Sequence, residues 1–288
     1  MVLVPGGPAR VGSERYYPEE RPVREVRVGA VWFDPHPVTN AEFARFVDDT
    51  GHVTVAEVAP DPADFPGADP ELLVPGSQVF TPTPGPVDLV DWTRWWRWQP
   101  GAQWRAPDGP GSSWQQVADH PVVHVGWEDA LAYAAWAGKD LPTEAEWEHA
   151  ARGGLVDRDY AWGDELSPGG ELLANTWQGR FPWQDQDPRG HRRTSPVGSY
   201  PPNGYGLLDM IGNVWEWTGS PWTTSHTGAE PAPCCGGTAV RETDRKVTKG
   251  GSHLCSPDYC RRYRPAARQG HGVRDTTSHV GFRCVRRG

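Results

Sequence analysis

The chain has 288 residues and a formal net charge of −9, which argues against the basic face that nucleic acids and anionic membranes require. Its 34 Gly and 30 Pro exclude a mostly helical or mostly sheet protein, while its 16 Trp exclude a disordered one. No window approaches the ~18 apolar residues of a membrane span, and the first residues lack a signal-peptide pattern. We therefore expect a cytoplasmic protein with reduced thiols.

Three segments carry the signals of helices. Two of them open with a threonine followed three positions later by a glutamate, the pattern of a capping box, ahead of apolar residues on one face. The other runs into a glycine suited to a left-handed C-terminal cap. The segments are residues 39–47, 127–139 and 141–154, with caps at Thr39 and Glu42, Gly138, and Thr143 and Glu146.

Three shorter segments are typical of strands, because their apolar residues alternate or form a buried run. Between residues 58 and 120 almost nothing is periodic, so we expect a long loop that is functional or held by its own tryptophans. We expect one α+β domain over residues 1–288, with little regular secondary structure and long loops. The strand segments are residues 24–33, 120–127 and 279–287.

The stretch KGGSHLCSPDYC contains two cysteines, Cys255 and Cys260, five positions apart. Two thiolates without harder ligands suit a soft ion such as Cu(I), whereas zinc usually requires four ligands in repeated pairs. The intervening Ser-Pro-Asp favours a turn, and Gly250-Gly251 permits close backbone approach. The spacing leaves three alternatives open: a copper-type pair, a disulfide or redox pair, and two unrelated core thiols.

The remaining cysteines and a pair of histidines favour ordinary structural roles. Cys234 and Cys235 are interpreted as incidental thiols of a loop, since a disulfide between neighbours is strained, and the alternative is an auxiliary metal or redox role. Cys284 is expected to be a small buried hydrophobe, and His120 and His124 to be core or surface histidines. The sequence contains no H-E-x-x-H, Walker loop, G-x-G-x-x-G or G-x-S-x-G, which removes the common zinc-protease, nucleotide and serine-hydrolase functions.

A second informative stretch, residues 203–220, combines two carboxylates with turns that present backbone carbonyls. Oxygen ligands of this kind suit Ca²⁺, and the alternative is an irregular loop with solvated acids. The residues concerned are Asp209, Gly212, Val214 and Glu216.

At these stretches the sequence resembles the formylglycine-generating enzymes, the sulfatase-modifying factor family. GLLDMIGNVWEWT, KGGSHLCSPDYCRRYRPAAR and GFRCV occur in that order, and PVTNAEFARFV and HPVVHVGWEDALAYAAWAGKDLPTEAEWEHAARGG extend the likeness along nearly the whole chain. LPTEAEWE and GNVWEW mark a wider superfamily, whereas the paired cysteines of HLCSPDYC mark the formylglycine enzymes themselves.

The resemblance implies a variant C-type-lectin-like fold and a Cu(I)-dependent oxidase. Such an enzyme uses O₂ and a thiol reductant to convert a cysteine in a C-x-P-x-R segment of an unfolded or nascent sulfatase to Cα-formylglycine. By analogy, Cys255 and Cys260 hold Cu(I), and the substrate cysteine joins as a third thiolate. Ser252 and Trp215 match pocket residues that order water and shape the oxygen site, and Arg268 matches an arginine that lines the pocket. We expect a monomer without nucleic-acid or membrane partners.

The resemblance also implies two Ca²⁺ sites and a set of substrate contacts. One calcium set is complete in this sequence, but in the other an arginine, Arg189, stands where the family has an aspartate, so either Asp185 or Asp187 substitutes or the site is empty. Ser278 and His279 are expected to contact substrate, with His279 in place of a polar amide. The complete calcium set is Asp209, Gly212, Val214 and Glu216, and the partial one is Asn175 and Thr176.

Two other functions stay open at this stage. A non-catalytic lectin-like binding module of the same superfamily would not need the cysteine pair, which counts against it. An iron-dependent sulfoxide synthase would need an additional N-terminal helical domain with histidine ligands, and the 288 residues contain no such segment.

Overall fold

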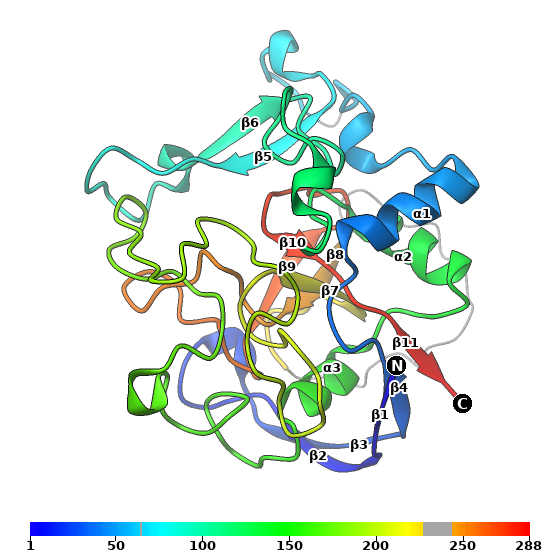
Figure 1. Ribbon diagram of the computed structural model, residues 1–288, viewed down its shortest axis with the longest axis vertical. Coiled ribbons are helices and arrows are strands. Elements are labelled where there is room, and N and C mark those ends of the chain that lie inside the picture. The colour runs from blue at the N-terminus through cyan, green and yellow to red at the C-terminus, as the bar shows by residue number, and fades with distance from the viewer. Residues whose placement is uncertain (64, 227–243) are drawn as a thin grey trace.

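The computed structural model describes residues 1–63, 65–226 and 244–288, and Figure 1 shows short helices and strands connected by long loops. Within these ranges no helix combines the length and the apolar character needed to cross a membrane. The α-helices are α1 (Asn40–Thr50), α2 (Trp127–Trp136) and α3 (Glu144–Ala151), and the 3-10 turns are η1 (Pro18–Glu20), η2 (Val55–Glu57), η3 (Pro70–Leu72), η4 (Trp92–Arg94), η5 (Trp114–Val117) and η6 (Pro168–Gly170).

The strands form four small sheets among the described residues. Their orders are β10-β7-β8-β9, β1-β4-β11, β2-β3 and β5-β6. The three-stranded sheet brings the two chain ends together beside β4 (Figure 1). The strands are β1 (Val2–Val4), β2 (Gly7–Val11), β3 (Arg24–Val28), β4 (Val31–Phe33), β5 (Gly76–Phe80), β6 (Trp96–Pro100), β7 (Trp215–Pro221), β8 (Arg245–Lys249), β9 (Arg268–Gly272), β10 (Val280–Gly281) and β11 (Val285–Arg287).

The three expected helices form, and their ends follow from the predicted caps. The Glu42 carboxylate accepts the Thr39 N–H at 2.8 Å, while Thr39 Oγ1 accepts the Glu42 N–H at 3.2 Å. Thr143 and Glu146 make the same reciprocal pair at the start of α3. Gly138 follows α2 with φ +64°, the left-handed conformation that ends helices at glycine.

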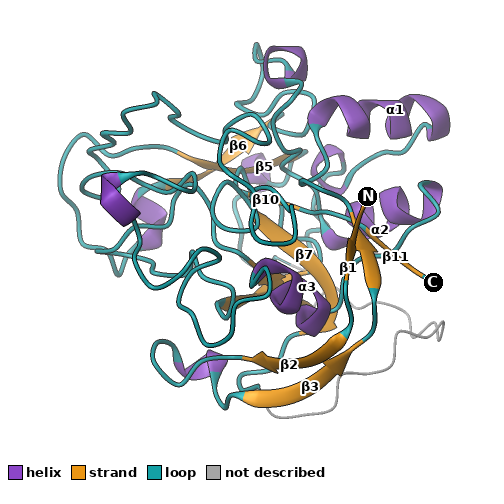
Figure 2. Cartoon of the chain, turned by 60° about the horizontal axis from the view of Figure 1, so that its bottom comes forward, coloured by secondary structure: helices purple, strands orange, loops and turns teal. Residues whose placement is uncertain are grey.

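The four-stranded sheet positions the candidate site. Its strand β7 pairs with β10 so that Trp215 is opposite Val280, and with β8 so that Glu216 is opposite Lys249. The segment that follows β8 and the segment that precedes β10 therefore meet at one end of β7. Figure 2 shows α3 beside this sheet. The Trp147 indole N–H donates to Glu216 of β7, and Lys249 of β8 donates to Glu148.

Three strand predictions need correction. Residues 24–33 form two strands, β3 and β4, that belong to different sheets. Residues 120–127 are buried as expected but contain no strand, because His124 takes φ +62° and breaks the extended backbone. Residues 279–287 form two short strands, β10 and β11, rather than one. The supposedly structureless region 58–120 contains the β5–β6 hairpin, with five consecutive antiparallel pairs.

Aromatic side chains supply much of the core, as the tryptophan content implied. A compact group of rings connects the β5–β6 hairpin to the segment before Cys260. Tyr259 stacks on Phe181 with ring centroids 4.4 Å apart, and Trp95 meets both rings edge-on at 5.4 Å. The fully buried tryptophans are Trp95, Trp104, Trp147, Trp215 and Trp217.

Candidate active site

The loop after β8 is shaped by its two glycines. Gly250 and Gly251 both have positive φ, +93° and +73°. A side chain at Gly251 would place its Cβ 2.7 Å from the Arg262 carbonyl oxygen. Only glycine fits this approach, and it holds the start of the loop against the residues that follow Cys260.

This loop brings Cys255 and Cys260 together. The Ser-Pro-Asp turn forms as expected, with the Cys260 N–H donating to the Ser256 carbonyl at 2.8 Å. The two Sγ atoms lie 3.3 Å apart. That distance is too long for the ~2.05 Å bond of a disulfide and short enough for one soft ion to contact both sulfurs. Cys255 is buried and Cys260 is half-buried.

The two thiols have different proton affinities. A hydrogen bond from the Cys255 thiol, together with the nearby Arg262 guanidinium, lowers the pKa of Cys260 to about 7. Burial raises the pKa of Cys255 well above its usual range, and the adjacent Cys260 adds to the effect. In the metal-free protein Cys260 is therefore the more readily ionised sulfur.

Ser252 and His279 connect the cysteine pair to the β10 side of the sheet. The Ser252 N–H donates to Cys255 Sγ at 3.4 Å, and Ser252 Oγ lies 3.1 Å from His279 Nδ1. Trp215, directly across β10, donates its backbone N–H to the His279 carbonyl at 2.9 Å and is itself buried. The structure thus brings three of the predicted residues, Ser252, Cys255 and His279, into contact, and the Trp215 backbone lies beside His279.

A cavity of about 810 Å³ opens beside His279. Its wall joins tryptophans of the β5–β6 hairpin, histidines of the central sheet and apolar residues of the 55–73 segment. The cysteines and Ser252 do not line it, whereas His279 does, and His279 contacts Ser252, whose N–H contacts Cys255. The wall includes Trp96, Trp98, Arg245, His271, Arg274, Asp275 and His279.

Arg268 lies outside this cavity wall, contrary to the expectation that it lines the pocket. Its guanidinium donates to both oxygens of Glu144, at 2.6 and 3.0 Å, and to the Glu19 and Thr223 carbonyls. It is 1% exposed. Because all its described donors are directed into the protein, the structure gives it a packing role rather than a substrate contact.

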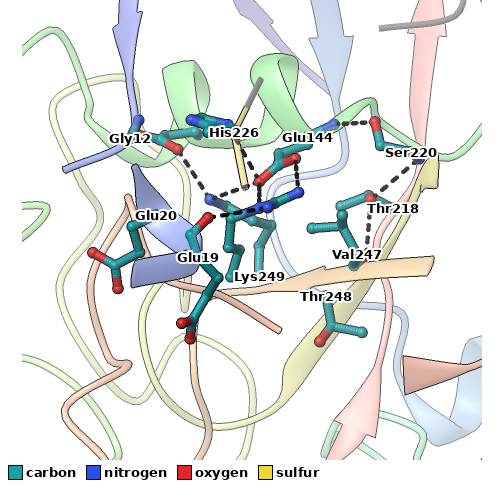
Figure 3. Close-up of polar contacts among 12 residues, drawn as sticks. Gly12, Glu19, Glu20, Glu144, Thr218, Ser220, His226, Val247, Thr248 and Lys249 are labelled. Carbon is teal, nitrogen blue, oxygen red and sulfur yellow. Dashed lines mark hydrogen bonds and ion pairs between the residues drawn. The ribbon is translucent and has the colours of Figure 1, made fainter. Parts of the chain in front are cut away.

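Arg268 belongs to a buried ion-pair cluster, part of which is drawn in Figure 3. Lys249 lies 3.0 Å from Glu148 and 3.7 Å from Glu144, and both of these carboxylates come from α3. Glu148 also accepts the Arg152 guanidinium at 2.6 Å. We call Glu144, Glu148, Arg152, Lys249 and Arg268 the ion-pair cluster.

Ser278 is buried beside the cavity rather than facing it. Its Oγ accepts the Phe80 N–H at 3.1 Å, and its own N–H donates to the Gln78 carbonyl at 3.0 Å. Ser278 therefore fastens the β5–β6 hairpin to the segment before β10. Its role is to position the cavity wall.

The residues of the first calcium set do not all fit an ion. Glu216 is buried and accepts two hydrogen bonds from Arg283 and one from Trp147, each at 2.7 Å. A cation there would have to displace Arg283. Asp209 fits better, because its Oδ1 is buried with no hydrogen-bond partner among the described residues, and burial raises its pKa. Gly212 and Val214 lie between the two acids.

The residues of the second calcium set fit an ion less well than those of the first. Asn175 donates to the Arg193 carbonyl at 2.9 Å, and the Thr176 carbonyl accepts from Gln178 at 3.0 Å. Asp187 accepts two backbone N–H groups, including that of Arg189. Across residues 1–63, 65–226 and 244–288, no three His, Cys, Asp or Glu side chains are grouped as metal ligands would be.

Sequence reasoning missed three contributors to the site. His271 lies nearly parallel to His279 at 6.3 Å between ring centroids, and Trp96 meets His279 edge-on at 4.7 Å. Arg262 supplies the positive charge near Cys260. The alternating tryptophans of β6 and the short RQGHG strand were visible signals, although neither alone points to this site. Cys234 and Cys235 lie outside the described residues.

Comparison with known proteins identifies relatives over the full length. A family profile described as "Sulfatase-modifying factor enzyme 1-like domain" matches residues 1–288. The formylglycine-generating enzyme of Mycobacterium tuberculosis is 56% identical over 99% of this chain and 97% of its own length. That of Thermomonospora curvata is 46% identical over 99% and 92%. A Bos taurus protein named "Inactive C-alpha-formylglycine-generating enzyme 2" is 38% identical over 99% and 87%.

Among solved structures, PvdO from Pseudomonas aeruginosa aligns with a TM-score of 0.63 at 24% identity, covering 99% of this chain and 93% of PvdO. At that identity the likeness shows the fold alone, and it agrees with the expected α+β, variant C-type-lectin-like architecture. The profile and the relatives agree with the motifs quoted above: the chain belongs to the sulfatase-modifying factor family, with the formylglycine-generating enzymes.

Proposed function

We propose that this protein is a formylglycine-generating oxidase that activates sulfatases. Its substrate is a cysteine in a C-x-P-x-R segment of an unfolded or nascent sulfatase, and O₂ is the oxidant. Identity of 56% to a named formylglycine-generating enzyme supports the activity. The observation that carries it is the pair of sulfurs, Cys255 and Cys260, held 3.3 Å apart and linked through Ser252 to His279 of the cavity wall.

The residues present fit Cu(I) better than a harder ion. Both side chains of the pair are thiols, and no carboxylate or third cysteine joins them among the described residues. Cys260, with its pKa of about 7, supplies a thiolate near neutral pH. When bound, Cu(I) supplies a soft, redox-active centre that can accept a further thiolate and react with O₂.

The residues of this chain bind the substrate peptide, hold the cysteine pair in place and exclude water from it. The aromatic cavity wall, with Trp96 and Trp98, offers an extended peptide a large apolar surface. Trp215 is buried with its ring 6.4 Å from that of His271, and the Ser252 N–H donates to Cys255 Sγ. Arg262 stabilises negative charge at the sulfurs.

The overall reaction balances with two reducing thiols. One substrate R–CH₂–SH, one O₂ and two reductant thiols give R–CHO, H₂S, one disulfide and one water. The substrate Cβ loses hydrogen and its C–S bond breaks, while the aldehyde oxygen enters by hydrolysis of a thioaldehyde. A reducing, cytoplasmic compartment suits this chemistry, because it supplies the reductant and keeps the pair as thiols.

Calcium belongs to the proposal only at Asp209. Its buried, unpartnered Oδ1 suits a hard cation, whereas the paired Glu216 does not. Calcium binding there would raise the melting temperature of the wild type and leave an Asp209→Ala variant unchanged.

A non-catalytic binding module is the second candidate. A relative at 38% identity is named inactive, so the fold alone does not secure the activity. Under this alternative the cavity would still bind a peptide, but the reduced, copper-loaded protein would leave the cysteine of that peptide unchanged.

The direct test is conversion of a synthetic C-x-P-x-R peptide by reduced protein reconstituted with Cu(I), with the aldehyde detected by mass spectrometry. Wild type should produce aldehyde, and Cys255→Ser should lose about a thousandfold or more of kcat/KM, since it removes a ligand of the reacting centre. Cu(I) binding, measured by competition with a chelator, should fall in the same variant.

Cys284→Ala is the matched control, because Cys284 is a free, buried thiol that lies outside the cysteine pair. It should keep both turnover and copper binding. Full turnover by Cys255→Ser, or loss of copper binding by Cys284→Ala alone, would contradict the assignment of the Cys255–Cys260 pair as the reacting centre.

A further inference from the structure

His124 is a buried histidine in an uncommon backbone conformation, and it plays no part in the copper chemistry proposed above. Its φ is +62°, in the left-handed region that a residue other than glycine adopts at an energetic cost. Its side chain is fully buried. Such a conformation persists where the surrounding structure requires it, so the contacts of His124 indicate its purpose.

The ring of His124 joins two segments that are far apart in the sequence. Nδ1 lies 2.7 Å from Ser77 Oγ in β5, and Nε2 lies 2.8 Å from the carbonyl oxygen of Pro107, in the loop that follows β6. A carbonyl oxygen can only accept, so Nε2 carries the proton and Nδ1 accepts the hydrogen of the Ser77 hydroxyl. Burial lowers the pKa of His124 to about 4, so the ring is neutral at pH 7. The neutral ring therefore satisfies both partners at once.

The backbone of His124 joins a third segment. Its N–H donates to the carbonyl oxygen of Thr277 at 3.0 Å, in the stretch that precedes β10. The same stretch is bonded to β5, because the Gln78 N–H donates to the Thr276 carbonyl at 3.1 Å and the Ser278 N–H donates to the Gln78 carbonyl at 3.0 Å. His124 thus lies where β5, the loop after β6 and the stretch before β10 meet.

Two of these segments carry part of the cavity wall that the proposed function assigns to the substrate peptide. His124 itself is fully buried behind that wall. Because β5 and β6 are paired along five consecutive positions, a shift of Ser77 would move the tryptophans of β6 as well. A residue that fixes β5 against the stretch before β10 therefore fixes the shape of the cavity. The lining residues concerned are Gln78, Trp96, Trp98, Thr276 and Thr277.

We propose that His124 is a positioning residue for peptide binding: it holds the β5–β6 hairpin against the stretch before β10 and so keeps the cavity in the shape that the peptide requires. The residues that flank the reacting cysteine, rather than the cysteine itself, occupy this cavity. His124 acts through its hydrogen bond to Ser77 and makes no contact with the peptide. This inference rests on the proposed function for the identity of the peptide, and it adds a determinant of affinity that is separate from the cysteine pair.

The test measures the affinity of a peptide that cannot react, in which serine replaces the cysteine of C-x-P-x-R. His124→Asn suits this test, because asparagine tolerates positive φ but is too short to reach Ser77 and Pro107 together. Ser77→Ala removes the other partner and leaves Nδ1 as a buried acceptor without a donor. We expect each variant to weaken the Kd of this peptide about tenfold and to change kcat for the cysteine peptide by less than about twofold.

The double variant shows whether the two residues act through each other. If the bond between Ser77 and His124 carries the effect, the double variant should bind the peptide no more weakly than the weaker single variant. A loss of about a hundredfold, the product of two independent losses, would overturn the coupling on which the proposal depends. An unchanged Kd in both single variants would overturn it as well, and so would a fall in kcat with Kd intact.

His226→Asn is the matched control. His226 is also buried, and burial likewise lowers its pKa to about 4, but it lies 3.6 Å from Glu144 of the ion-pair cluster. Whatever this substitution does to the melting temperature, it should leave the peptide Kd unchanged. An equal loss of affinity in this control would show a general effect of removing a buried histidine and would overturn the proposal. The melting temperature and the Cu(I) binding of each variant verify folding.

A second readout needs neither peptide nor copper. Amide hydrogen exchange at Gln78 and Ser278 reports the contact between β5 and the stretch before β10, because both N–H groups donate across it. In His124→Asn and Ser77→Ala these two amides should exchange about tenfold faster than in wild type, while the paired amides of β8 and β9 should be unaffected. Unchanged exchange at both amides overturns the proposal.

The two proposals fail in different ways. If wild type binds the serine peptide but makes no aldehyde from the cysteine peptide, the proposed oxidase activity fails and the role of His124 in binding stands. If wild type makes aldehyde and both single variants bind the serine peptide as tightly as wild type does, only the role of His124 fails.

Discussion

The ion-pair cluster and the site around His279 are two buried regions with different polar groups, and Gly250-Gly251 connect Lys249 of the first to Ser252 of the second. Before the glycines, Lys249 enters the ion-pair cluster, where each named charge has an opposite charge within 3.0 Å. After them, the site keeps neutral or unpartnered groups: the His271 Nδ1 and the Thr277 Oγ1 are buried without a hydrogen bond among the described residues. Paired groups hold a fold together, whereas unpaired ones are available to a ligand.

The largest expected effect is on the ion-pair cluster. Lys249→Ala should lower the free energy of unfolding by about 3–5 kcal/mol, because it leaves Glu148 buried beside a single cation. Urea denaturation at neutral pH measures it.

An exposed ion pair serves as the control for that experiment. Arg10 pairs with Asp157 at the surface, where the two side chains are 46% and 54% exposed. Arg10→Ala should change the unfolding free energy by less than about 1 kcal/mol. Equal losses in the two variants would erase the contrast between buried and exposed charge.

The next largest effect is that a fall in pH should reduce the stability contributed by the ion-pair cluster. Lys249 and Arg152 hold the pKa of Glu148 at about 2, below its ordinary 4.5 despite burial. Because the folded-state pKa is the lower one, this stability is complete above about pH 5 and is lost as the pH falls toward 2, for a total of about 3 kcal/mol.

Glu148→Gln isolates that contribution. The difference in unfolding free energy between wild type and the variant should shrink from about pH 6 to about pH 3. A constant difference would show that the Glu148 charge does not contribute in this way.

The smallest expected effect concerns the reactivity of the two thiols, Cys255 and Cys260. In metal-free protein, alkylation of Cys260 should reach half its maximal rate near pH 7, while Cys255 reacts slowly because burial raises its pKa. Cys255→Ala removes the donated hydrogen bond and should move the midpoint toward the ordinary thiol value. Peptide mapping after timed alkylation distinguishes the two sites, and equal rates would contradict the asymmetry.

Local chemistry predicted the parts of the fold that depend on neighbours in sequence. The capping boxes at Thr39 and Thr143 and the left-handed Gly138 need only a few adjacent residues, and all three are present. The strand at 120–127 failed because His124 adopts positive φ in a tertiary setting, with its ring held by Ser77 and the Pro107 carbonyl.

The candidate site likewise combines local contacts, which the sequence predicts, with contacts between residues far apart in the sequence, which it does not. The Cys255–Cys260 contact follows from a turn and two glycines within a dozen residues, so the sequence could suggest it. The partner of Arg268, Glu144, is 124 positions away, and no local pattern reveals it. The β5–β6 hairpin was missed because prolines surround it, although Trp96 and Trp98 alternate as strand residues do.

The stacked rings of Phe181 and Tyr259 have a consequence for inhibitors. Trp95 touches both rings directly before β6, whose Trp96 lines the cavity, and Tyr259 immediately precedes Cys260, so packed aromatic rings join the hairpin to the thiol pair. A compound wedged under the hairpin would also shift Cys260, and could disable the thiol pair from a distance without ever touching sulfur.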